Sequence, residues 1–278
     1  MESGPAGFAV DVTGRVSAAR FGARFWPVFL LGLLGIAALP ITTYALLTGG
    51  TLPAGVPDLP VPTLVALSLI NPLLYLAIAS ALGAALAHRA GLVSHLVAHR
   101  VAGAPLAAPL RAGAPLAVAI GLGLAIVMTL ADLAARPYLG EAWLAATGDA
   151  RTGTAAALLV GMLYGGISEE VMLRWGLMTL LAWAGWRVAG RGRSRPGRVV
   201  MWTAIVLAAL IFGAAHLPAV AALAPLNPPL VARTILLNAL GGVAFGWLYW
   251  RRGLEVAMIA HAAVHVGCAG LVLLGVGG

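Results

Sequence analysis

Long apolar stretches separated by short polar segments dominate the chain. A helix needs roughly 20 apolar residues to cross the hydrocarbon core of a bilayer. Seven stretches meet this requirement, and we expect each to be one membrane span. They cover residues 27–48, 63–87, 114–135, 154–184, 199–217, 231–250 and 254–275. The pattern predicts an all-α fold, a polytopic membrane helical bundle with seven spans.

The fourth stretch, residues 154–184, is too long for one upright span. It could tilt, project from the bilayer, or break near the glycine pair Gly165 and Gly166. A break within residues 154–186 would give eight helices. It would also disturb the alternation of loop charge along the chain, unless one of the two pieces is re-entrant.

Composition supports the membrane assignment. The chain is 61% hydrophobic and only 9% charged, whereas soluble domains carry about a quarter charged residues. The net charge is +8, and all 17 residues counted as Lys or Arg are arginine, as expected for a GC-rich bacterial genome. A basic balance can indicate nucleic-acid binding, but these arginines lie in short loops and accompany no nucleic-acid motif. We therefore expect a lipid bilayer, and no nucleic acid, as partner.

The loops alternate in charge, which predicts an orientation. Arginines concentrate in the N-terminal tail, in the loops 88–113 and 185–198, and after the sixth span. The alternate loops contain most of the loop acids, Asp58, Glu141 and Asp149. Cytoplasmic loops carry the excess of arginine. The N-terminus is therefore expected in the cytoplasm, with the protein in the bacterial cytoplasmic membrane.

Polar groups at membrane depth divide the chain. We predict a single membrane domain, residues 1–278, with a cytoplasmic tail (1–26), three spans without chemistry (27–135) and a catalytic core (154–275). The core contains nearly every ionisable side chain expected inside the membrane. Such residues are rare and indicate function by default. The single cysteine, Cys268, excludes an internal disulfide and a cysteine-rich metal site.

Two glutamates and an arginine form the first cluster, in ISEEVMLRWGL (167–177). Residues four apart share a helix face, and glutamate before arginine is the favourable order, so Glu170 and Arg174 are expected to pair. Glu169 points about 100° away around an α-helix and is left without this partner. An unpaired carboxylate suits a group that takes up and returns protons.

Three histidines follow on later spans. His216 ends the fifth span, and His261 and His265 lie four apart on one face of the seventh. This spacing is that of the two histidines in the H-E-x-x-H zinc motif, although no glutamate follows His261. A carboxylate and imidazoles around a water-filled pocket suit hydrolysis, in which the carboxylate deprotonates a water. The imidazoles could orient that water, stabilise an oxyanion or ligate a metal.

In order along the chain, these residues resemble the motifs of the CPBP intramembrane proteases. That family includes the type II CAAX prenyl endopeptidases and bacterial bacteriocin-processing or immunity proteins. Its pattern is E-E-x-x-x-R, F-x-x-x-H and then H-x-x-x-N on successive membrane helices. The matching residues are Glu169, Glu170 and Arg174, then Phe212 and His216, then His261.

The resemblance implies a role for each residue. Glu169 would activate the water, assisted by His216. His261 and the residue four later would stabilise the oxyanion, while Glu170, Arg174 and Phe212 would support the site. The chain departs from the pattern in having His265 where the family has asparagine. Neutral histidine can donate like the amide, but it can also ligate a metal.

We therefore expect an intramembrane endopeptidase that hydrolyses a membrane-associated peptide or protein. A glutamic mechanism without metal is favoured. The alternative is a metallo-endopeptidase with zinc held by Glu169, His216, His261 and His265. Two other classes of function remain open at this stage, a non-proteolytic membrane scaffold or immunity protein, and a proton- or metal-coupled transporter. CAAX prenylation is eukaryotic, so a bacterial member would process a peptide, a leader sequence or a membrane protein.

Overall fold

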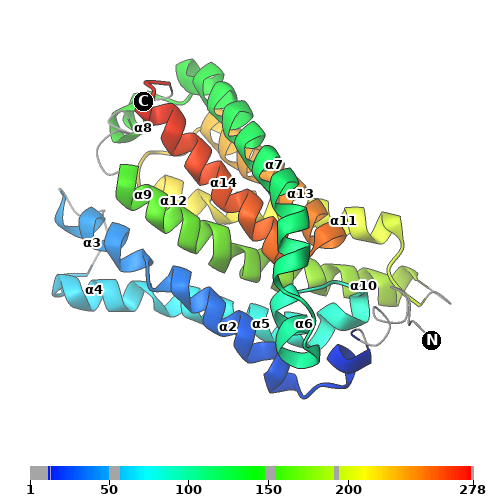
Figure 1. The fold of residues 1–278 in the computed structure, drawn as a ribbon. Coiled ribbons are helices and arrows are strands. Elements are labelled where there is room, and N and C mark those ends of the chain that lie inside the picture. The colour runs from blue at the N-terminus through cyan, green and yellow to red at the C-terminus, as the bar shows by residue number, and fades with distance from the viewer. Residues whose placement is uncertain (1–11, 13, 50–56, 148–153, 191–193, 277–278) are drawn as a thin grey trace.

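The fold is a bundle of helices, shown in Figure 1. The computed structural model describes residues 12, 14–49, 57–147, 154–190 and 194–276, and no strand occurs among them. The helices of the first half are α2 (Phe21–Ile36), α3 (Leu39–Thr48), α4 (Val61–Ser68), α5 (Ile70–Ala90), α6 (His95–Ala102), α7 (Ala107–Ala135), η1 (Arg136–Tyr138) and α8 (Glu141–Thr147). Those of the second half are α9 (Thr154–Val160), η2 (Gly161–Glu169), η3 (Val171–Met178), α10 (Thr179–Ala189), α11 (Arg198–Ala215), α12 (Leu217–Ala221), α13 (Pro228–Arg252) and α14 (Leu254–Leu273).

Seven helical segments in the described part of the chain are long and apolar enough to span a membrane. They confirm the seven predicted spans and the all-α polytopic fold. The segments are Phe21–Thr48, Val61–Ala90, Ala107–Tyr138, Ala155–Ala189, Arg198–Ala221, Pro228–Arg252 and Leu254–Leu273. The fourth is one continuous helical segment, so the eight-helix alternative does not apply. Most of the predicted tail, residues 1–11 and 13, lies outside the described residues.

The first span begins earlier than the apolar pattern indicates. Helix α2 starts at Phe21, whereas sequence reasoning ends the tail at residue 26. Arg24 therefore lies inside the bundle. Its guanidinium donates to the carbonyl of Ala84 on α5 at 2.8 Å and to that of Ala19 at 2.7 Å. These hydrogen bonds offset the cost of burying the charge.

The fourth span is the centre of the bundle. Its middle section, η2 and η3, packs against α2, α5, α11 and α14, and it runs between the blue N-terminal and red C-terminal helices in Figure 1. Small residues permit this close packing. A Cβ added to Gly176 would lie 2.7 Å from the Cα of Ala79, and a Cβ added to Gly35 would collide with the carbonyl of Leu163.

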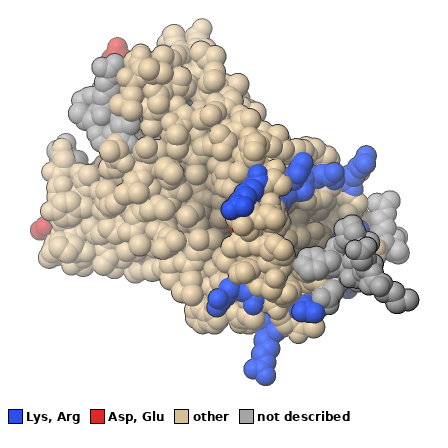
Figure 2. Space-filling view, viewed as in Figure 1, with Lys and Arg blue, Asp and Glu red and all other residues tan. Residues whose placement is uncertain are grey.

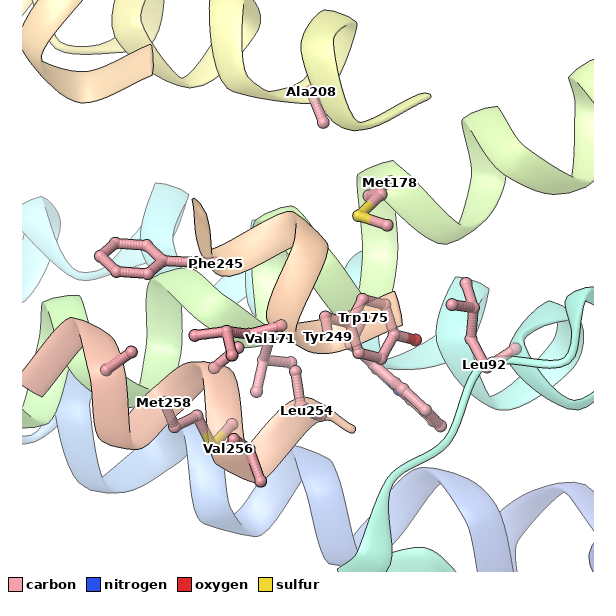
Figure 3. Close-up of a cluster of buried hydrophobic side chains, with 14 of the residues drawn as sticks. Leu92, Val171, Trp175, Met178, Ala208, Phe245, Tyr249, Leu254, Val256 and Met258 are labelled. Atoms are coloured by element: carbon pink, nitrogen blue, oxygen red, sulfur yellow. The ribbon is translucent and has the colours of Figure 1, made fainter. Parts of the chain in front are cut away.

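Large buried side chains fill the bundle around the fourth span. Val171, Trp175 and Met178 come from η3, and Phe245 and Tyr249 come from α13 (Figure 3). The labelled cluster also includes Leu254, Val256 and Met258 of α14. The site described below is built directly onto this packed region, because Val171 and Trp175 flank Glu170 and Arg174 in sequence.

Charge is distributed unevenly over the surface. Arginines gather at the end of the bundle where α5, α10 and α13 finish, which we call the basic end, and the most prominent acidic atoms in this view lie at the other end (Figure 2). At the basic end, Glu255 connects the start of α14 to the start of α6. Its carboxylate accepts from the Ser94 hydroxyl at 2.6 Å and from the backbone N–H groups of His95 and Leu96 at 2.8 and 2.9 Å.

Candidate active site

The helix that carries the two glutamates is π-helical over most of its middle. Segments η2 and η3 are π-helices of nine and eight residues. π-Helices usually occur as single turns and often mark functional sites. This geometry differs from the α-helix assumed in the sequence analysis, and it widens the turn on which Glu169 and Glu170 lie.

Glu170 forms the buried half of the site. It is fully inaccessible, and its Oε1 atom lies 3.1 Å from Nη1 of Arg174 and 2.8 Å from Nδ1 of His261. The Arg174 guanidinium lies 5.2 Å from the ring centroid of Phe212 and 5.3 Å from that of Phe245. Glu170, Arg174 and Phe212 thus form one buried network, and Glu170 pairs with Arg174 as their spacing predicts.

Glu169 and His216 form the accessible half. Oε1 of Glu169 lies 4.0 Å from Nε2 of His216, with 14% and 33% of the two side chains exposed. Nδ1 of His216 lies 2.9 Å from the carbonyl of Phe212. A carbonyl only accepts, so this nitrogen carries a proton and, in the neutral ring, Nε2 presents a lone pair toward Glu169. A water between these two acceptors can donate to both.

A helix interruption positions His216. Helix α11 ends at Ala215 and α12 begins at Leu217, with His216 at the joint. Pro218 follows two residues later, and proline cannot donate the backbone hydrogen bond that a continuing helix requires. At this interruption His216 lies 4.0 Å from Glu169, although counting residues along straight spans places the two at different depths.

His261 and His265 stack behind Glu170. Their ring centroids are 5.2 Å apart and nearly parallel. Both rings lie against Gly165, where an added Cβ would be 2.6 Å from Nε2 of His265 and 3.3 Å from Nε2 of His261. The ring of His265 also covers Gly161. Its Nε2 atom is buried and has no hydrogen-bond partner among the described residues.

A cavity of about 640 Å³ opens beside Glu169 and His216. Its walls come from α5, from the fourth span and from α11 with α12, and they are mostly apolar. His261 and His265 do not line it. The structure therefore places two of the four predicted catalytic residues on the cavity and the other two in the layer behind Glu170.

Tyr164 is a cavity residue that sequence reasoning missed. It lies five residues before Glu169 and lines the same cavity. Residues five apart are hydrogen-bonded neighbours in a π-helix, whereas an α-helical count does not put them on one face. The sequence contains no signal that links the two residues, because the apolar pattern does not distinguish a π-helix from an α-helix.

The donors of the alternative zinc site are divided between the two layers. Nδ1 of His261 is bonded to Glu170, and His216 directs Nδ1 to a carbonyl. Within the described ranges, no three side chains among His, Cys, Asp and Glu are grouped to hold a metal ion. A zinc set made of Glu169, His216, His261 and His265 would require these side chains to move together.

The second half of the chain has a recognisable family signature. Residues 151–267 match the model of a family described as type II CAAX prenyl endopeptidase, Rce1-like. This part of the chain, less than half of its length, is similar to that family, which supports the resemblance seen in the sequence motifs. The Rce1-like match includes every predicted site residue, from Glu169 to His265. No curated protein and no solved structure matches the chain significantly.

The Rce1-like family is a family of CAAX-type intramembrane proteases. The Rce1-like segment covers the fourth to sixth spans and most of the seventh, and it leaves the first three spans outside. One wall of the cavity, formed by Tyr75, Ile78 and Leu82 of α5, therefore comes from outside the Rce1-like segment.

Proposed function

We propose that the protein is an intramembrane endopeptidase in which Glu169 activates a water held between its carboxylate and Nε2 of His216. The observation that carries the proposal is the 4.0 Å gap between these two atoms beside the large cavity. This gap exceeds a direct hydrogen bond. It suits a water that donates one hydrogen to each acceptor.

In the proposed reaction, the water oxygen attacks the carbonyl carbon of the scissile peptide bond and Glu169 takes its proton. The tetrahedral intermediate then collapses and the carbon–nitrogen bond breaks. Glu169 returns the proton to the leaving nitrogen, so that hydrolysis adds the elements of water across the bond. His216 holds the attacking water through its lone pair and is itself held by the Phe212 carbonyl.

The oxyanion role that the resemblance implies for His261 and His265 requires the substrate carbonyl to reach these residues from the cavity, which neither of them lines. If Glu170 is ionised, it accepts from Nδ1 of His261, and Nε2 can donate only when the ring carries a second proton. If Glu170 is protonated and donates to Nδ1, the neutral ring carries its hydrogen on Nε2 and can donate. The protonation state of Glu170 therefore decides whether Nε2 of the neutral His261 ring carries a hydrogen that it can donate. The ring of His265 stacks on the ring of His261.

The cavity favours an apolar, membrane-associated peptide or protein as substrate. Ile78, Met172, Leu177 and Ile211 are among its apolar wall residues. We place the basic end on the cytoplasmic side, because arginine-rich loops stay in the cytoplasm, and we propose the bacterial cytoplasmic membrane as the location.

Cleavage by the purified protein in lipid vesicles tests the proposal. The substrates are membrane-associated peptides, with prenylated CAAX peptides among them. Glu169→Gln keeps the shape of the side chain and removes the base, so cleavage should fall by at least about 100-fold. Glu141→Gln, at an exposed glutamate of α8, is the matched control and should cleave like the wild type. Full activity in Glu169→Gln would contradict the mechanism. A wild type that cleaves no substrate would favour a scaffold, immunity or transport function.

A further inference from the structure

A second cavity lies at the basic end, away from the site described above. It has a volume of about 90 Å³ and is enclosed by the start of α2, the end of α5, the loop before α6 and the fourth span. Its polar walls include Arg24, His88, Trp175 and Arg195. It shares no lining residue with the cavity beside Glu169.

Two hydrogen-bonding groups on this cavity have no partner. Trp175 is 97% buried, with 3% of its surface exposed, and its indole Nε1 finds no acceptor among the described residues. Nδ1 of His88 is also buried and unpartnered. An indole nitrogen can only donate, and buried donors in native proteins are nearly always satisfied. The cavity is thus expected to contain an acceptor.

Among the residues that the structure describes, the walls of the cavity carry positive charge and no carboxylate. Arg24 is 9% exposed, and its acceptors among the described residues are backbone carbonyls, including those of Ala84 and Ala19. Arg195 extends over Gly91, where an added Cβ would lie 3.5 Å from its Nη1. Neither arginine has a carboxylate within ion-pair distance among the described residues. The nearby acid, Glu255, is already engaged by Ser94 and two backbone N–H groups.

We propose that this cavity binds a phosphoryl anion, either the headgroup of an anionic lipid or free phosphate. Phosphate oxygens are strong acceptors that match arginine and indole donors. The cytoplasmic leaflet is rich in anionic lipids, and basic pockets between membrane helices bind their headgroups. The cavity would otherwise hold roughly three waters, which would satisfy the donors but add no negative charge beside the buried Arg24.

An occupant would contact the span that carries the catalytic glutamates. Trp175 follows Arg174 directly in η3, and Arg174 pairs with Glu170. A ligand that holds the indole would therefore steady the buried network behind Glu169.

Binding to the full-length protein in detergent tests the proposal. The probes are phosphatidylglycerol, phosphatidylcholine and inorganic phosphate. Bound mass is read by native mass spectrometry, and the ligand-induced rise in melting temperature is measured in parallel. Trp175→Phe removes the indole N–H, and Arg195→Gln removes a charge from the wall. Their controls are Trp202→Phe, at a partly exposed tryptophan that packs edge-on against Trp250, and Arg198→Gln, at the first residue of α11 and three residues after Arg195.

We expect phosphatidylglycerol to bind the wild type and both controls equally, and to bind Trp175→Phe and Arg195→Gln about tenfold more weakly. Phosphatidylcholine should produce no comparable rise in melting temperature. The same pattern with inorganic phosphate alone would identify free phosphate as the ligand. Equal binding by Arg195→Gln and Arg198→Gln, or by the two tryptophan variants, would overturn the proposal. So would a wild type that binds neither anion, because the cavity would then hold only water.

Discussion

Replacing Arg174 by methionine tests whether the buried network supports the fold. The guanidinium lies 3.1 Å from Glu170, and the two side chains are 3% and 0% exposed. Arg174→Met keeps the apolar stem that packs beside Phe212 and Phe245 but leaves the Glu170 carboxylate without its cation. Removing one partner of a fully buried ion pair costs about 3–5 kcal/mol. We expect a loss of that size in the free energy of unfolding.

Asp132 and Arg233 provide the comparison. They also form an ion pair, with Nε of Arg233 2.6 Å from Oδ1 of Asp132. However, these side chains are 31% and 23% exposed, and an ion pair that reaches solvent contributes about 0–1 kcal/mol. Denaturant titration in mixed micelles, followed by circular dichroism, measures both losses. The reasoning fails if Arg174→Met destabilises the protein no more than Asp132→Asn. A double variant Glu170→Gln/Arg174→Met should recover part of the loss.

Three further predictions concern the site. Gly165→Ala places a methyl group against His261 and His265, so the rate of cleavage should fall at least tenfold. The control is Gly123→Ala, whose added Cβ meets nothing within 4 Å. Unchanged cleavage by Gly165→Ala would mean that these rings need no fixed position. His216→Phe removes the acceptor for the attacking water, so kcat should drop by about 10²–10⁴-fold while the melting temperature stays nearly unchanged. A His216→Phe variant with the kcat of the wild type would exclude His216 from the reaction. Prolonged dialysis against a chelator should leave cleavage intact under the glutamic mechanism, whereas loss that zinc restores would establish the metallo-endopeptidase alternative.

The apolar pattern alone predicted the seven spans and the all-α fold. Each span buries its own backbone hydrogen bonds, so its existence depends on local composition and can be recognised from sequence. Spacing was also sufficient to separate Glu169 from the pair formed by Glu170 and Arg174, because that pair is local to one helix.

Contacts between distant segments could not be predicted in the same way. The burial of Arg24 depends on the carbonyl of Ala84, sixty residues away, and the engagement of Glu255 depends on the start of α6. The apolar pattern of the sequence does not indicate either of these two contacts. The approach of His216 to Glu169 joins the fifth span to the fourth, and no local pattern specifies how these two spans pack. The π-helix arises within tight packing against α2, α5 and α14, so it too reflects the assembled bundle.

The two sides of the cavity differ in origin. The fourth, fifth and seventh spans contribute the predicted hydrolytic groups, whereas α5 contributes only apolar and aromatic wall residues such as Tyr75 and Leu82. Substitutions along α5 can therefore change which chains are admitted while the bond-breaking groups stay constant. If the protein cleaves peptides as proposed, replacing α5 by that of a relative should change which substrates are cleaved while the predicted hydrolytic residues stay the same.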